Sequence, residues 1–406
     1  MEKTVVQKYG GSSLATEAKV LAVAAKILAA RKAGYSPVAV VSAQGDETDE
    51  LLARARSISP RPAARELDAL LAVGEQKSSA LLAIALCKLG LQALSLTGGQ
   101  AGIHTKGAYG DSRILAIETE KLRGYLLQGY LPVVAGFQGV NAQGETTTLG
   151  RGGTDITAVA IAAALGCPCE IYTDVDGIYQ ADPSLVPAAK KLTAISWDDL
   201  SEMSALGARV LNERAVELAK KYAVPIYIGG AHSSEKGTYV LEVTKVEEDK
   251  ITAVLVDDDI LRINIGDVPP DPWSQQQLFE LLSEKGVGMG MVQREWTAEG
   301  RMRISFTCAG NCRQIVECLE SQLPYPVAII RDEARISLLG SGVLNQARVT
   351  SCIMQNLASL DVGLRHLITS ERSLSLFIGK GDRERVAARL AQTFDLCERS
   401  VAPYGR

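Results

Sequence analysis

The sequence predicts an α/β protein with a mostly parallel central sheet and helices on both faces, followed by a smaller unit that occurs twice. Up to about residue 245, short apolar runs that end in glycine alternate with alanine-rich helical segments. This is the pattern of parallel strands joined by crossover helices. A charged stretch, VLEVTKVEEDK, is the expected linker. After it, the order strand, helix, strand, strand, helix, strand occurs twice, with Val287 and Val362 at matching places.

The composition fits this class and argues against some partners. A chain of 406 residues with 47% hydrophobic content is long enough for two or three globular domains. The net charge of −4 gives no sign of nucleic-acid or anionic-membrane binding. No long apolar run and no secretory signal occur, so we expect a cytoplasmic protein without a membrane partner. The 8 cysteines form no CxxC pair, and we expect reduced thiols and no metal-ligating set.

The first expected strand, Thr4–Tyr9, carries Lys8 near its end and runs into the turn Gly10-Gly11. Either Ser12 or Ser13 could cap the helix that follows. A lysine between a strand end and a helix N-terminus suits the charge stabilisation that phosphoryl transfer needs. An exposed lysine after an edge strand would give the same pattern. No GxxxxGK[ST] motif occurs, so the chain is not a P-loop enzyme.

Further strands are expected from the apolar runs Val38–Ser42, Leu91–Thr97 and Leu131–Val134, with an amphipathic segment, Arg113–Leu127, before the last of them. An acidic turn, QGDETDE, follows the first of these strands and leads into a helix. On residue type alone, this turn could be a plain loop rich in capping residues.

The glycine-rich turn from Gly150 to Gly153 is the centre of the candidate site. Its glycines let a ligand approach the backbone and leave N–H groups free for an anion. Thr154 or Asp155 could cap the helix that follows, and Arg151 suits a carboxylate held by two hydrogen bonds. A simple strand-to-helix turn with a solvated Arg151 fits the same residues.

A second motif follows the next expected strand, Cys169–Asp174. The stretch TDVDGIYQADP places acidic residues, a turn and Tyr179 where a parallel strand delivers its ligand contacts.

Together these motifs resemble the amino-acid kinase family, and within it the aspartate kinases. The resemblance covers nearly the whole chain in the family's order. The matching stretches are KYGGSS at Lys8–Ser13, VVSAQGDETDEL at Val40–Leu51, Gly74-Glu75, GFQG at Gly136–Gly139, TTLGRGGTD at Thr147–Asp155 and TDVDG at Thr173–Gly177.

The resemblance implies a three-layer amino-acid-kinase fold over residues 1–245 and two ferredoxin-like ACT modules, at 246–325 and 326–406. It implies transfer of the ATP γ-phosphoryl group to the side-chain carboxylate of L-aspartate, with ATP and Mg²⁺ as cofactors. The implied product, 4-phospho-L-aspartate, begins lysine, threonine and methionine synthesis in the family. It also implies a homo-oligomer assembled through the ACT modules.

The same resemblance, with the residue chemistry above, assigns roles to individual residues. The catalytic set is Lys8, Arg209 and Asp155. The nucleotide-binding set is Lys8, Tyr9, Gly10, Gly11, Thr173, Asp174, Tyr179 and Ser184. The aspartate-binding set is Ser42, Thr48, Glu75, Arg151, Gly152, Gly153 and Thr154, with Glu75 resembling the group that holds the substrate ammonium.

Several positions depart from the family pattern. Ser184 stands where a basic residue is usual, Arg209 replaces a phosphate-contacting lysine, and Gly229 stands where relatives carry an arginine. The turns before the first ACT helices, PPDPWS at Pro269–Ser274 and GVLNQARV at Gly342–Val349, have lost the family's DKPG-like or HPG-like form. We therefore expect weak or altered inhibition by lysine or threonine.

Three other functions fit the same sequence. One is a kinase of this fold that acts on glutamate or N-acetylglutamate, although such a kinase would rarely carry the repeated C-terminal unit. Another is a catalytically weak regulatory subunit that senses amino acids, which the changes at Ser184, Arg209 and Gly229 favour. In the third, the repeated units only dimerise the chain and sense no ligand.

Overall fold

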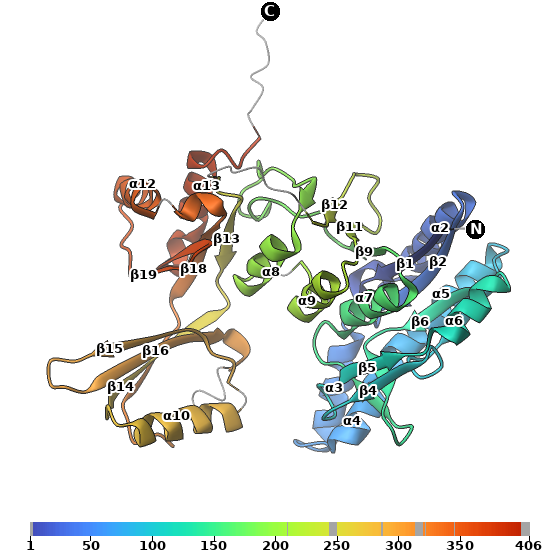
Figure 1. The fold of residues 1–406 in the computed structure, drawn as a ribbon, viewed down its shortest axis with the longest axis horizontal. Helices are drawn as coiled ribbons and strands as arrows, with labels where there is room; N and C mark the ends of the chain where they lie inside the picture. Colours follow the sequence, from blue (N-terminus) through green and yellow to red (C-terminus); the bar gives the residue numbers. More distant parts are fainter. Residues whose placement is uncertain are drawn as a thin grey trace, which may run out of the picture. The chain divides into compact units, whose positions relative to one another are not determined.

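The computed structural model describes residues 3–208, 210–242, 250–285, 287–312, 320, 322–344 and 346–398. The chain forms two compact units (Figure 1). Of the described residues, the N-terminal unit takes 3–179, 191–205 and 210–242, and the C-terminal unit takes 180–190, 206–208 and those from 250 onward. The expected linker lies largely outside the described residues.

An eight-stranded sheet forms the middle of the N-terminal unit, in the order β10-β12-β11-β9-β1-β2-β6-β3. Its neighbours pair in parallel, except that β11 and β12 are antiparallel. The strands are β1 (Lys3–Tyr9), β2 (Tyr35–Val41), β3 (Ala93–Leu96), β6 (Leu131–Ala135), β9 (Cys169–Thr173), β10 (Ala194–Ile195), β11 (Ile226–Gly230) and β12 (Thr238–Val240).

Helices cover both faces of this sheet, which confirms the expected three-layer α/β class. The helices of the unit are α1 (Gly11–Leu14), α2 (Glu17–Lys32), α3 (Glu47–Ile58), α4 (Ala64–Leu71), α5 (Val73–Lys88), α6 (Thr119–Leu127), α7 (Gly153–Leu165), α8 (Trp197–Ala205) and α9 (Glu213–Lys221). Tyr9 of β1 and Val41 of β2 pack in one apolar cluster with Ile27 of α2 and Leu86 of α5. Successive side chains of a strand point to opposite faces, so Lys8 lies on the other face, which α7 covers.

A smaller sheet of the same unit has the order β5-β4-β7-β8. Its strands are β4 (Ile103–Lys106), β5 (Arg113–Ile117), β7 (Gln138–Val140) and β8 (Thr146–Thr148). The expected amphipathic segment Arg113–Leu127 is therefore a strand followed by a helix. The smaller sheet ends at the glycine-rich turn, because β8 leads directly into residues 149–153.

The C-terminal unit contains two four-stranded antiparallel sheets. One has the order β15-β16-β14-β17, from β14 (Ile260–Val268), β15 (Gly290–Trp296), β16 (Met302–Ala309) and β17 (Val327–Ile330), with α10 (Pro272–Glu284) between β14 and β15. The other has the order β13-β18-β20-β19, from β13 (Ala253–Asp257), β18 (Glu333–Leu339), β19 (His366–Thr369) and β20 (Ser373–Gly379), with helices α12 (Gln346–Ser359) and α13 (Arg383–Thr393).

The structure differs here from the expected contiguous modules at 246–325 and 326–406. Strand β13 precedes the first repeated unit in the chain but pairs with β18 of the second, as Val254 does with Leu338. The second sheet therefore takes its outer strand from the residues expected in the first module, and the first sheet takes β17, which pairs with β14, from those expected in the second. Sequence periodicity could not reveal this, because it identifies strands and not their partners.

Two short segments of the expected N-terminal domain, 180–190 and 206–208, belong instead to the C-terminal unit. In the first, Val254 N–H donates to the Gln180 carbonyl at 2.7 Å and Lys190 N–H donates to the Leu396 carbonyl at 2.9 Å. In the second, the Cβ that a side chain at Gly207 would add lies 2.7 Å from Cβ of Asp257. Both segments pack against the C-terminal unit by contacts distant in sequence.

Two predicted helix caps are wrong. The long helix after β1 is capped by Thr16, whose side chain accepts from Lys19 N–H, instead of by Ser12 or Ser13. Helix α7 has Gly152 at its N-cap without a side-chain cap, so neither Thr154 nor Asp155 has that role.

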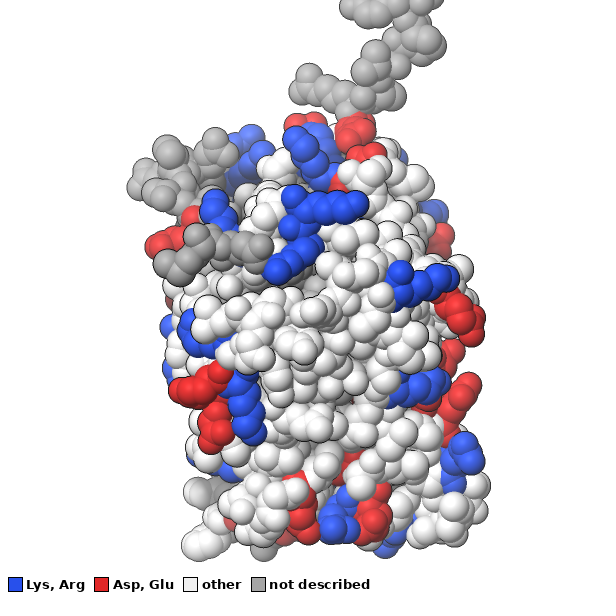
Figure 2. Space-filling view, turned by 90° about the vertical axis from the view of Figure 1, so that its right-hand side faces the viewer, with Lys and Arg blue, Asp and Glu red and all other residues white. Residues whose placement is uncertain are grey.

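One helical stretch, Ala64–Lys88, is long and apolar enough by composition to cross a membrane. It comprises α4 and α5, and α5 packs against α2, β3 and β6 in the interior. Of its most apolar window 56% is buried, while Val73, Leu81 and Ile84 of α5 are exposed. Figure 2 shows a face, on the side of α2, α5 and α6 in Figure 1, whose middle carries few charged side chains.

Candidate active site

An ion pair joins the central strand to the helix that covers it. Nζ of Lys8 lies 2.7 Å from Oδ1 of Asp155, and the two side chains are 12% and 13% exposed. Lys8 stands near the end of β1, and Asp155 is in the first turn of α7. Because the pair is largely shielded from water, its Coulomb attraction is stronger than that of a surface pair. Two of the three predicted catalytic residues are therefore in contact.

The turn Gly10-Gly11 lies against the ends of two neighbouring strands. Gly10 N–H donates to the Tyr172 carbonyl of β9 at 3.1 Å, and Gly45 N–H donates to the Gly11 carbonyl at 3.1 Å. A Cβ on Gly11 would lie 2.5 Å from the Ala43 carbonyl oxygen. A side chain at position 11 would thus force these backbones apart, so the turn requires glycine there.

The glycine-rich turn contains two residues with a left-handed backbone. Gly150 has φ of 77° and Gly152 has φ of 72°, and α7 begins at Gly153. Arg151 between them is exposed, whereas Thr154 is buried against Gly136, where an added Cβ would lie 2.5 Å from Cγ2 of Thr154. The Arg151 guanidinium is accessible to a ligand, while Thr154 fixes the start of the helix against β6.

Glu75 of α5 is buried beside the loop that follows β2. Its Oε1 accepts from Ala43 N–H at 3.0 Å, and its Oε2 has no hydrogen-bond partner among the described residues. Burial raises the pKa of Glu75 to about 7. A buried carboxylate with a free oxygen can receive a cationic group such as an ammonium. Ser42, next to Ala43, and Thr48, in the first turn of α3, are both partly exposed.

The predicted nucleotide-binding residues Thr173, Asp174 and Tyr179 lie at the end of β9, which pairs with β1, or after it. Thr173 Oγ1 donates to Asp174 Oδ1 at 2.9 Å, and Tyr179 OH donates to Asp176 Oδ1 at 2.8 Å. Lys191 donates to Asp176 Oδ2 at 2.9 Å, and this bond is the main reason that the pKa of Asp176 is lowered. The Lys191 charge is therefore already paired with a carboxylate.

Ser184 lies in the segment 180–190 of the C-terminal unit, where its N–H and hydroxyl both donate to Asp182 Oδ1, at 2.8 and 2.7 Å. Arg209 lies outside the described residues.

Sequence reasoning missed the side chains that hold the glycine-rich turn and the end of β8 that leads into it. Asp68 of α4 is 1% exposed and accepts from the N–H groups of Gly110 and Thr148, at 3.0 and 2.7 Å. Asn212 and Arg214, at the start of α9, bind the turn directly. No local pattern marks these residues, because their partners are distant in sequence.

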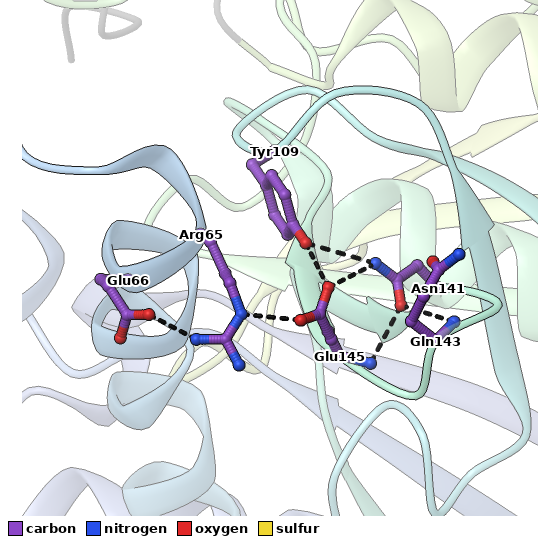
Figure 3. A network of polar contacts seen from close by, with 6 residues as sticks. All are labelled: Arg65, Glu66, Tyr109, Asn141, Gln143 and Glu145. Carbon is purple, nitrogen blue, oxygen red and sulfur yellow. Dashed lines mark hydrogen bonds and ion pairs between the residues drawn. The ribbon is translucent and has the colours of Figure 1, made fainter.

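A second polar network holds the loop between β7 and β8, as Figure 3 shows. Arg65 Nε donates to Glu145 Oε1 at 2.7 Å, and Tyr109 OH and Asn141 Nδ2 both donate to Oε2. The Tyr109 hydroxyl, followed by Arg65, holds the pKa of Glu145 at about 2. Arg65 also pairs with Glu66 on α4. This network ties the loop to α4, the helix that also carries Asp68.

Within the described ranges, no group of three or more His, Cys, Asp and Glu side chains could hold a metal ion. None of the seven cysteines that the structure describes forms a disulfide: Cys87, Cys167, Cys169, Cys308, Cys312, Cys352 and Cys397.

Comparisons with known proteins show the family to which the chain belongs. Residues 3–230 match the amino acid kinase family. The aspartokinases of Thermus thermophilus, Mycolicibacterium smegmatis and Corynebacterium glutamicum are 40, 40 and 38% identical to this chain over 97% of its length, and the match covers 98, 96 and 96% of theirs.

Two solved structures have a similar fold. One is E. coli aspartokinase III in complex with aspartate and ADP, with a TM-score of 0.80 and 22% identity over 97% of this chain and 100% of that one. The other is aspartate kinase from Synechocystis, with a TM-score of 0.54 and 33% identity over 99% of this chain and 71% of that one.

The fold and these relatives together define a phosphoryl-transfer enzyme of the α/β class, and the structure places a lysine at a strand end and a glycine-rich turn in its candidate site. The chain belongs to the amino acid kinase family, and within it to the aspartokinases. Its expected enzyme class, a phosphotransferase with a carboxyl group as acceptor, agrees with these relatives.

Proposed function

We propose that this chain transfers the γ-phosphoryl group of ATP directly to the side-chain carboxylate of L-aspartate. A carboxylate oxygen attacks the γ-phosphorus in line, the bond to the β–γ bridging oxygen breaks, and ADP leaves as 4-phospho-L-aspartate forms. The observation that carries this proposal is the shielded Lys8–Asp155 pair beside the glycine turn at the end of the central strand.

Lys8 would stabilise the negative charge that the phosphoryl group carries in the transition state. Its ammonium lies near the backbone of Gly10, because a Cβ there would be 3.6 Å from Nζ. Asp155 holds the ammonium in place from α7. Phosphoryl transfer needs alignment and charge stabilisation more than covalent chemistry, so a fixed lysine with nearby backbone amides supplies much of what is required.

The aspartate would lie between the glycine-rich turn and Glu75. The exposed Arg151 guanidinium suits one carboxylate, and the free Oε2 of Glu75 suits the ammonium. Ser42 and Thr48 supply hydroxyl groups on the neighbouring loop and helix. These groups together select a small acidic amino acid with a free α-ammonium.

The site is compatible with a Mg²⁺ ion that binds together with the nucleotide. The described residues offer no cage of three ligands, but Mg²⁺ typically binds one or two carboxylates and the substrate phosphates. Asp155 and Asp174 are the carboxylates that would hold it. It would neutralise charge on the β- and γ-phosphates, while Thr173, Asp174 and Tyr179 border the nucleotide.

The two antiparallel sheets of the C-terminal unit would form ACT modules, with homo-oligomers assembled through them. Their strand orders, β17-β14-β16-β15 and β13-β18-β20-β19, are both those of a four-stranded ferredoxin-like sheet. Lysine is bound by E. coli aspartokinase III in another solved structure of similar fold, which has a TM-score of 0.77 and 21% identity over 96% of this chain and 99% of that one. Lysine is therefore the first effector to test, and threonine, which the family resemblance suggests, is the second.

A hydroxamate assay for acyl phosphate, with ATP, Mg²⁺ and L-aspartate, tests the proposed reaction. The expected result is product with aspartate and little or none with glutamate. Product with glutamate alone would reassign the acceptor. No product with either acid, from protein that still binds ATP, would favour the regulatory-subunit alternative.

A further inference from the structure

The first turn of α9 is attached to the backbone of the glycine-rich turn through Asn212. Asn212 Nδ2 donates to the Arg151 carbonyl at 2.9 Å. The same side chain accepts from Arg214 N–H through Oδ1 at 3.0 Å and so caps α9. A Cβ on Gly152 would lie 2.5 Å from Asn212 Nδ2, so the turn and the amide are closely packed. One amide thus connects the helix end to the Arg151–Gly152 peptide.

Arg214 binds the other end of the same turn. Its Nη1 donates to the Leu149 carbonyl at 2.7 Å and to Asp111 Oδ1 at 3.2 Å, and its Nη2 donates to the Ser112 carbonyl at 3.2 Å. Leu149 is fully buried, whereas Asp111 is 72% exposed, so we expect the carbonyl contacts to matter more than the ion pair. A planar guanidinium can serve several acceptors in fixed directions, which a lysine cannot.

These contacts matter because the turn has little rigidity of its own. Glycines at 150, 152 and 153 leave its backbone many accessible conformations. The Arg151 side chain is exposed, so it does not lock the turn by packing. The position of Arg151 therefore depends on the bonds that α9 makes at the carbonyls of Leu149 and Arg151.

We propose that Asn212 and Arg214 are positioning residues for aspartate, which hold the turn so that Arg151 meets a substrate carboxylate. The inference rests on the proposed function, in which Arg151 binds aspartate. Neither residue touches substrate in this role. Both act through the backbone of the turn, so their loss should weaken aspartate binding selectively.

Asn212→Asp separates positioning from helix capping. Asp caps a helix about as well as Asn, so α9 keeps its cap. The variant loses the donor to the Arg151 carbonyl and places a carboxylate oxygen against it instead. We expect KM for aspartate to rise about tenfold, with KM for ATP and the melting temperature close to wild type. Equal rises in both KM values with a lower melting temperature would show a merely structural role, and unchanged kinetics would refute positioning by Asn212.

Arg214→Lys and Asp111→Ala form a matched pair. Arg214→Lys keeps the charge but cannot hold both carbonyls, and it should also raise KM for aspartate by about tenfold. Asp111→Ala removes only the exposed ion pair and should leave the kinetics unchanged. If Asp111→Ala has the same effect as Arg214→Lys, the ion pair and not the carbonyl contacts positions the turn, and the proposal is wrong for Arg214.

A double-mutant cycle with Arg151→Ala separates this inference from the proposed function. If Asn212 acts through Arg151, Asn212→Asp should add little to the effect of Arg151→Ala. Additive effects would overturn the positioning role. If Arg151→Ala alone leaves KM for aspartate unchanged, the assignment of Arg151 itself fails. The single variant Asn212→Asp cannot test that assignment, so the two failures are distinguishable.

Discussion

Nζ of Lys8 and Oδ1 of Asp155 lie 2.7 Å apart, although β1 and α7 are separated by most of the N-terminal unit in sequence. The alternation of side chains along β1 turns Lys8 toward α7, and the first turn of that helix carries Asp155. The pair places a fixed positive charge beside the glycine turn, where the phosphates of ATP are proposed to bind.

Replacing Lys8 by Ala should lower kcat by about 10²–10³-fold and change the KM values less, because the lysine is proposed to act on the transition state. Steady-state kinetics with ATP and aspartate would measure this effect. Lys32→Ala, at the exposed end of α2, is the matched control and should behave as wild type. An unchanged kcat for Lys8→Ala would remove this lysine from the chemistry.

Arg151→Ala should raise KM for aspartate by about 10–100-fold, the loss expected for a charge-assisted hydrogen bond to a carboxylate. KM for ATP should change little, since Arg151 is proposed to bind aspartate and not the nucleotide. Varying each substrate at saturating levels of the other would separate the two constants. A larger effect on ATP than on aspartate would contradict the assignment.

Stability should depend on pH through Glu75. The folded pKa of about 7 lies above the usual value of 4.5, so folding favours the protonated form. The contribution of Glu75 to stability is therefore fully present below pH about 4.5 and is lost as pH rises through about 7. The loss is about 3 kcal/mol as an upper bound.

Glu75→Gln removes this titration, so the variant should gain stability relative to wild type as the pH rises from 5 to 8. Denaturant unfolding at several pH values would measure the difference in free energy of unfolding. A difference that stays constant with pH would show that Glu75 does not titrate in this range.

Inhibition by lysine or threonine should be weak. The family resemblance predicts that an effector would bind the backbone at the first turn of α10. The N–H of Ser274 in this turn already donates to Asp271 at 2.9 Å, and the Ser274 hydroxyl donates to the same carboxylate at 2.8 Å. An amino-acid carboxylate would have to displace these bonds. Isothermal titration calorimetry should therefore show no binding of lysine or threonine at micromolar concentrations. Tight binding of either amino acid would contradict this prediction.

The sequence predicted the order of strands and helices well where apolar periodicity was strong. It placed β1, β2, β6 and β9 within a few residues, and it put Lys8, Gly10-Gly11 and the glycine-rich turn next to strand ends. It misplaced the caps of α2 and α7, because several residues near each helix start could have capped it equally well. It also left β13 in the wrong module, since strand partners are chosen by packing between distant segments.

By itself, the sequence determined the α/β class, the repeated C-terminal unit and the residue types of the site, because periodicity and glycine placement are local properties of the chain. Only the tertiary structure decided which groups meet: Lys8 with Asp155, Glu75 with the backbone of Ala43, and Asn212 with the carbonyl of Arg151. These pairs form when strands and helices far apart in sequence pack against one another, and each pairing depends on distances that no local pattern encodes.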